Sequence, residues 1–169
     1  MEWCGLIGIL MGCMLIAYQD FRSRYIHLSG LVLLCAGLLL YGAHTGIQSL
    51  LVNTLVNIVF TSFLLLLLHV YFFLRKGRWV NLFDRYIGIG DVLLLLVLAP
   101  AANLFNYLVI VIAGCICALL YGLFVNLVRR RRMIRIPLAG VMTLTFLAVL
   151  TACNLCSVSL LNDPVFSTW

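Results

Sequence analysis

The apolar and polar positions divide the chain into six apolar segments joined by short polar stretches. Continuous runs such as Leu64–Leu68 and Val92–Val97 lack the alternation of apolar and polar residues that strands of a membrane β-barrel show. A helix needs about 20 apolar residues to cross the hydrocarbon core of a bilayer, and it pairs its own backbone groups there. The pattern therefore predicts an all-α integral membrane protein, a six-transmembrane-helix bundle that forms a single domain over residues 1–169. The expected spans are Trp3–Gln19, His27–Gly42, Ile47–Leu74, Gly90–Asn103, Asn106–Val128 and Ile136–Leu155.

The composition excludes several other classes of protein. Apolar residues make up 65% of the chain and charged residues 9%, and a soluble domain of this length cannot remove so much apolar surface from water. A soluble enzyme and a disordered chain are therefore excluded. The net charge of +6 could suit a nucleic acid, but the basic residues lie beside apolar spans, so we expect no nucleic-acid partner.

The positions of the basic residues predict the orientation in the membrane. All eleven Lys and Arg residues follow the first, third or fifth expected span, and six spans place these three groups on one side. The positive-inside rule assigns that side to the cytoplasm, so both termini are expected outside. Anionic lipid headgroups are expected partners of the basic side chains. These side chains are Arg22, Arg24, Arg75, Lys76, Arg78, Arg85, Arg129, Arg130, Arg131, Arg132 and Arg135.

Two of the five acidic residues lie where the cytoplasmic edge of the membrane is expected. Asp20 ends the first span and Asp91 begins the fourth. Each has a structural interpretation, since Asp91 would interact favourably with a helix N-terminus and Asp20 has arginines nearby to pair with. Ionisable groups at a membrane also tend to be functional, so both interpretations stay open at this point.

Two glycines precede Asp91 and suggest a role for it. Gly88 and Gly90 flank Ile89, and glycine lets another backbone, such as an extended peptide, approach closely. The same glycines would also suit tight helix packing. Two carboxyl groups at one depth can hydrolyse an amide, because their mutual repulsion keeps one protonated while the other is ionised. The ionised group activates a water molecule and the protonated group donates to the carbonyl oxygen, which makes Asp20 and Asp91 candidate catalytic residues.

Three short motifs resemble those of a known family. Asp20-Phe-Arg-Ser-Arg-Tyr-Ile26 resembles a first catalytic motif, Gly88-Ile-Gly-Asp91 resembles a GxGD motif, and Arg135-Ile-Pro137-Leu resembles the start of a last helix. In order, spacing and membrane side they are similar to the type IV prepilin peptidases, including the archaeal preflagellin peptidases. These are GxGD-class intramembrane aspartic proteases. The chain resembles a divergent short member of this family over nearly its whole length.

The resemblance implies a specific activity and site. It implies an aspartic endopeptidase that cleaves the leader peptide of prepilin-like or pseudopilin-like precursors, as used in type IV pilus and secretion systems. Cleavage would occur at the cytoplasmic face of the inner (plasma) membrane of a prokaryotic cell. The resemblance also implies Asp20 and Asp91 as catalytic residues, Gly88 and Gly90 as an active-site loop, and neither a metal nor a cofactor.

The chain departs from the family pattern at three positions. His27 and Leu28 stand where the family usually has Pro-Asn, and Leu93 stands where it usually has Lys. The missing lysine removes a positive charge close to Asp91. The cytosolic insert with paired CxxC motifs that longer bacterial enzymes have is also missing from the sequence, so the resemblance gives no support for methyltransferase activity.

A non-catalytic membrane transporter or assembly factor on the same scaffold is the alternative. A transporter places polar residues and interrupted helices near the bilayer midplane, and the polar residues expected there are Asn53, Asn57 and His69. The acidic residues lie at the membrane edge, which favours the protease. Asp84 is interpreted as a solvated loop residue, and the seven cysteines as small hydrophobic residues.

Overall fold

The structure is a computed structural model that describes residues 2–23, 25–77, 88–129 and 137–155. Every element in these residues is a helix, as the sequence predicts. Trp3–Ser23, Ile47–Lys76 and Leu104–Leu127 are long and apolar enough to cross a membrane, and three shorter apolar helices accompany them. The elements are α1 (Glu2–Ser23), α2 (Leu28–Thr45), α3 (Ile47–Lys76), α5 (Ile89–Leu98), the 3-10 helix η1 (Ala99–Ala101), α6 (Leu104–Arg129) and α7 (Leu138–Leu155).

α1 and α2 form a tight antiparallel pair through glycine residues. A Cβ atom added at Gly37 would lie 2.6 Å from the backbone nitrogen of Ile9, and one added at Gly12 would lie 2.8 Å from the backbone of Leu34. No larger side chain fits these spaces unless the backbones move apart. Small residues at a helix crossing let two backbones approach closely in a membrane, and this pair fixes the end of α1 beside the start of α2.

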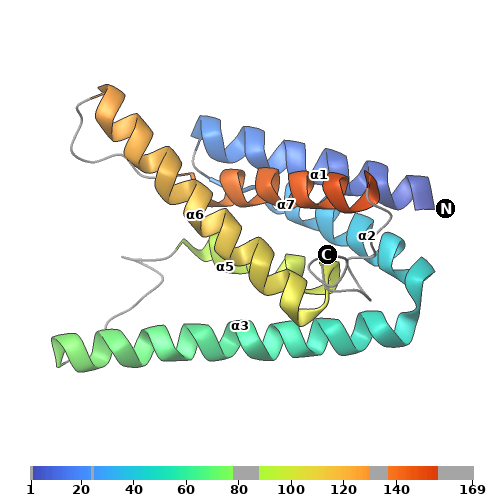
Figure 1. Ribbon diagram of the computed structural model, residues 1–169, viewed down its shortest axis with the longest axis horizontal. Helices are drawn as coiled ribbons and strands as arrows, with labels where there is room; N and C mark the ends of the chain where they lie inside the picture. The colour runs from blue at the N-terminus through green and yellow to red at the C-terminus, as the bar shows by residue number, and fades with distance from the viewer. Residues whose placement is uncertain (1, 24, 78–87, 130–136, 156–169) are drawn as a thin grey trace.

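α7 completes the central part of the bundle. It contacts both α1 and α6, and Figure 1 shows α1, α2 and α7 running side by side while α6 crosses obliquely and α3 runs along the opposite side. The core between α1, α2 and α7 contains the buried side chains of Ile16, Leu34, Met142 and Phe146. The C-terminal ends of α1, α3 and α6 all lie on the same side of the molecule (Figure 1).

The fourth expected span is interrupted. α5 has only 10 residues, which corresponds to about 15 Å at 1.5 Å per residue, and it passes into η1 at Ala99. Pro100 in η1 cannot donate a backbone hydrogen bond, which favours the break. The amide Nδ2 of Asn57 on α3 donates to the carbonyl oxygens of Ala99 and Ala102, at 2.8 Å each. Backbone groups in a bilayer must be paired within the protein, and Asn57 provides partners for two of them.

A second set of hydrogen bonds joins α6 to α3 and α5. Tyr107 on α6 donates from its hydroxyl to the carbonyl of Leu95 at 3.1 Å. The Tyr107 hydroxyl also lies 2.8 Å from Oγ1 of Thr61 on α3. Both side chains are buried, so these bonds hold α3 and α6 against α5 inside the apolar region.

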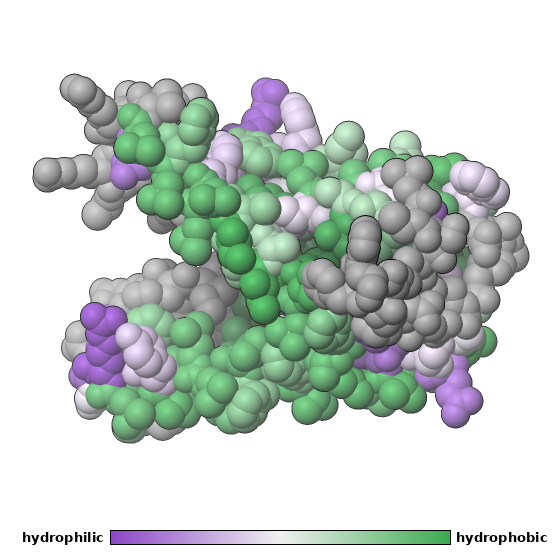
Figure 2. All heavy atoms as spheres, in the orientation of Figure 1, coloured by the Kyte–Doolittle hydropathy of each residue, from purple (hydrophilic) through white to green (hydrophobic). Residues whose placement is uncertain are grey.

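The outer surface is largely apolar. Figure 2 shows hydrophobic residues over most of α3 and α6, with hydrophilic residues gathered near the ends of the helices. Large side chains along α3 are exposed, including Phe63, Leu66 and Leu74. An apolar surface of this extent marks a membrane or a protein contact, in agreement with the membrane location that the sequence predicts.

Candidate functional site

Asp20 lies in the last turn of α1 and is held by the start of α7. Its side chain is buried, with 7% of its surface exposed. The backbone N–H of Gly140 donates to Asp20 Oδ2 at 2.6 Å. A hydrogen bond this short is typical of one that an ionised acceptor receives. Asp20 therefore has a defined partner that is 120 positions away in the sequence.

The local sequence explains why Gly140 reaches Asp20. Pro137 directly precedes α7 and accepts the backbone N–H of Val141 at 3.2 Å, so the N–H groups of the first turn remain available for other acceptors. A Cβ atom at Gly140 would lie 3.0 Å from the ring of Phe21 and 3.2 Å from Asp20 Oδ2. Glycine at this position lets the α7 backbone approach the carboxyl group.

Asp91 lies in the first turn of α5, as the sequence predicts. Gly88 is the N-cap residue, and its backbone N–H donates to the Asp91 side chain. The Asp91 backbone N–H in turn donates to the Gly88 carbonyl at 3.0 Å. An acidic side chain at the third helical position often pairs with the N-cap N–H in this way. The structural interpretation of Asp91 is thus present in the geometry, and it also fixes the direction of the carboxyl group.

The two carboxyl groups lie close enough for a direct electrostatic repulsion between Asp20 and Asp91. Asp20 is buried and Asp91 is half-buried, so the pair lies between solvent and the packed interior. A Cβ atom at Gly90 would lie 2.8 Å from Cδ1 of Ile26. The segment after Asp20 therefore packs directly on the GxGD segment, and the start of α7 closes the group on a third side.

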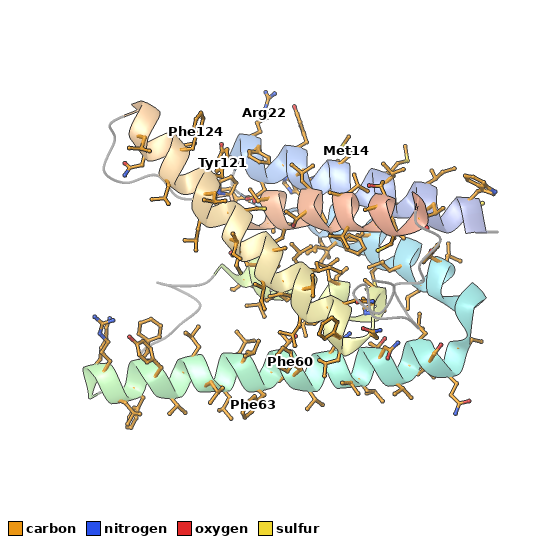
Figure 3. The ribbon with its side chains drawn as sticks, in the orientation of Figure 1. Met14, Arg22, Phe60, Phe63, Tyr121 and Phe124 are labelled. Carbon is orange, nitrogen blue, oxygen red and sulfur yellow. The ribbon has the colours of Figure 1, made fainter. Side chains whose placement is uncertain are left out.

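The other residues near Asp20 have separate roles. Arg22 donates from its guanidinium to the Tyr18 hydroxyl at 2.8 Å, and Figure 3 shows it pointing outward from α1. The backbone N–H of His27 donates to Gln19 Oε1 at 3.0 Å, which ties the start of α2 to the end of α1. Leu93, the position without the lysine of the family pattern, is exposed on α5.

Tyr121 of α6 also borders this region. Its ring meets that of Phe21 edge to face, with 5.7 Å between the ring centroids, and Figure 3 shows Tyr121 beside the end of α1. The contact joins α6 to the residue that directly follows Asp20. Asp84 and Arg85 lie outside the described residues.

Four residues near the carboxyl pair were singled out from the sequence, but the hydrogen-bond donor to Asp20 was not. Asp20, Asp91, Gly88 and Gly90 lie together, whereas Gly140 was not singled out. The signal was weak, because a glycine three residues after Pro137 is equally compatible with helix packing. Among the described residues, no group of three or more His, Cys, Asp or Glu side chains is placed to hold a metal ion.

The chain was compared with known proteins. No family model matches it. No curated protein matches it, and no solved structure does either. Support for a function therefore comes from the residues of the site and from the resemblance of their motifs.

Proposed function

We propose that the protein is an intramembrane aspartic endopeptidase that cleaves leader peptides from prepilin-like precursors. The observation that carries the proposal is the approach of Asp20 and Asp91, two carboxyl groups from remote parts of the chain, at the same end of the bundle. Each is oriented by a backbone N–H, from Gly140 and Gly88 respectively. Two interacting carboxyl groups can supply both the acid and the base for amide hydrolysis, as they do in aspartic proteases.

The proposed topology has six spans, with both termini outside and the carboxyl pair on the cytoplasmic side of the inner membrane. The common side of the C-terminal ends of α1, α3 and α6 supports it. Basic residues occupy all three ends, with Arg22 in the last turn of α1, Arg75 and Lys76 in that of α3, and Arg129 as the last residue of α6. Under the positive-inside rule such ends face the cytoplasm, where anionic headgroups would meet them.

The proposed substrate is a membrane protein with a short basic leader and an apolar helix. The peptide bond to be cut, commonly after a glycine, would lie at the membrane edge, beside the carboxyl pair. Exposed Gly88 and half-buried Gly90 leave room for an extended peptide backbone beside the acids. No step of the proposed reaction uses a metal or a cofactor.

The test is co-expression with a prepilin-like protein that carries a basic leader, scored by the mobility shift that leader removal produces. Asp20→Asn and Asp91→Asn are expected to lose cleavage while remaining inserted and folded, since Asn nearly preserves the shape of Asp. Glu2→Gln is the matched control, because it removes a carboxylate from the opposite end of α1. Retained cleavage in either Asp variant would refute the proposal.

A second candidate, a transporter, is favoured by one observation. The α5–η1 break beside buried Asn57 is the kind of interrupted helix with polar contacts that transporters use for binding. Asn57 Oδ1 is buried and has no hydrogen-bond partner, so it could receive a ligand. Cleavage that Asn57→Leu retains and Asp20→Asn loses favours the protease, whereas no cleavage by the wild type favours the transporter.

A further inference from the structure

The structure distinguishes the two carboxyl groups from each other. Asp20 is buried and accepts the short hydrogen bond from Gly140 at 2.6 Å, whereas Asp91 is half-buried and accepts from Gly88. The two groups repel each other, so a single proton shared between them will reside mainly on one. Which group holds it follows from their surroundings.

We propose that the N-terminus of α7, through the N–H of Gly140, keeps Asp20 as the ionised member of the pair, and that Asp91 carries the proton. A short N–H···O bond at a helix N-terminus favours a negative charge on the acceptor. Gly140 is then a positioning residue, because its backbone orients Asp20 and its missing side chain leaves room for the contact.

Further charged or polar groups of the described residues lie near the end of α1 and have contacts of their own. Arg22 donates to Tyr18 on the outer face of α1, and α6 contributes a tyrosine that reaches Phe21. α2 contributes His27, whose backbone binds Gln19. Within the described residues, the groups to consider in a titration of Asp20 include Asp91, Arg22, Tyr121 and His27.

The consequence for catalysis rests on the proposed function. The Asp20 carboxylate takes a proton from a water molecule, and the water oxygen adds to the scissile carbonyl carbon. The Asp91 proton goes to the carbonyl oxygen, which gives a neutral gem-diol. The protonated Asp20 then gives its proton to the departing amine as the C–N bond breaks, and one gem-diol hydroxyl returns a proton to Asp91. Both carboxyl groups end in their starting states.

The ionisation of Asp20 can be measured without any substrate. The chain has only five acidic residues, so the infrared C=O stretch of a protonated carboxyl group can be assigned by difference. An Asp91→Asn background isolates Asp20, and the Asp20→Asn/Asp91→Asn double variant gives the baseline. Asp20 is expected to show no protonated band at neutral pH. A protonated Asp20 under these conditions overturns the inference, whatever the result of the cleavage test.

Two variants at one position test the role of Gly140 in this background. Gly140→Pro removes the donor, and its titration midpoint for Asp20 is expected to rise by about one pH unit, the value of one lost charge-assisted bond. Gly140→Ala keeps the N–H, and its Cβ atom, 3.0 Å from the Phe21 ring and 3.2 Å from Asp20 Oδ2, requires only small shifts of these side chains. Its midpoint is therefore expected to rise clearly less than that of Gly140→Pro. An unchanged midpoint in Gly140→Pro, or an equal rise in both variants, overturns the inference.

The same two substitutions separate the inference from the proposed function when Asp91 is intact. With a synthetic prepilin-like peptide, Gly140→Pro is expected to lower kcat with little change in KM and to move the acidic limb of the pH profile upward. Gly140→Ala is expected to move this acidic limb clearly less than Gly140→Pro does. If the wild type cleaves but Gly140→Pro leaves the acidic limb of the pH profile unchanged, the inference fails and the protease assignment stands. If Asp20→Asn cleaves, the protease assignment fails while the infrared titration still decides the ionisation of Asp20.

Discussion

Replacement of Asn57 by leucine tests whether the interrupted helix depends on side-chain hydrogen bonds from α3. Asn57→Leu removes two bonds of 2.8 Å, to Ala99 and Ala102. A hydrogen bond between membrane helices contributes about 0.6 kcal/mol on average and up to about 1.7. The two bonds together therefore correspond to about 1–3 kcal/mol of unfolding free energy.

One feature of Asn57 reduces this loss. Its Oδ1 atom is buried without a hydrogen-bond partner, and an unpaired buried acceptor costs about 1–3 kcal/mol. Leucine removes that cost and fills a similar volume, but it leaves the carbonyl oxygens of Ala99 and Ala102 without this donor, at about 1–3 kcal/mol each. A net loss of about 1–3 kcal/mol is therefore expected. The measurement is reversible unfolding in mixed micelles, followed by circular dichroism.

Thr54→Val is the matched control for this measurement. The Thr54 hydroxyl donates only within α3, to the Leu50 carbonyl at 2.7 Å, so its removal does not uncouple α3 from η1. The expected change in unfolding free energy is within about 0.5 kcal/mol. If Asn57→Leu is as stable as the wild type, or if Thr54→Val costs as much, the reasoning about the interrupted helix is wrong.

Three further predictions concern packing and chemistry. Gly37→Ala is expected to lower the unfolding free energy by about 1–3 kcal/mol, because its Cβ atom would lie 2.6 Å from the backbone nitrogen of Ile9. Unfolding in micelles checks this, and an unchanged unfolding midpoint contradicts it. Gly90→Ala is expected to reduce cleavage, because its Cβ atom would meet Cδ1 of Ile26 at 2.8 Å, and Ile26→Ala should restore the rate in the double variant. Cleavage is expected to continue in the presence of EDTA. A clear loss of cleavage in the peptide assay would show that the reaction needs a metal ion, which the proposed reaction does not include.

The helical fold could be predicted from the sequence because the bilayer leaves few choices. Uninterrupted apolar runs and the absence of alternation specify helices, and basic residues mark their ends. The break after α5 was harder to predict, because Pro100 is the main local signal for it in an otherwise apolar stretch. Asn57, which pairs the carbonyl groups at the break, lies 42 positions from Ala99 in the sequence. Contacts of this kind are set by packing and leave no local pattern.

The sequence indicated that the two acids lie at one end of the bundle, but only part of their surroundings could be predicted from it. The motif around Asp91 contains its own local partner, since Gly88 lies three residues before it and caps the same helix. For Asp20, the sequence suggested nearby arginines as structural partners. In the structure, a hydrogen-bond donor to Asp20 comes from another helix, α7. The structure adds the Gly140 N–H, and it directs Arg22 to Tyr18.

Helix ends explain why the two carboxyl groups can lie in a partly buried position. The first N–H groups of a helix have no partner within the helix, and in an apolar environment each unpaired group is costly. α5 and α7 both begin beside the end of α1, and each supplies one such N–H to a carboxyl group, from Gly88 to Asp91 and from Gly140 to Asp20. The acids thus satisfy the helix ends while the helix ends hold the acids in position. A substitution that moves either helix start should therefore disturb both stability and cleavage, whereas a change at the opposite ends of the same helices should affect stability alone.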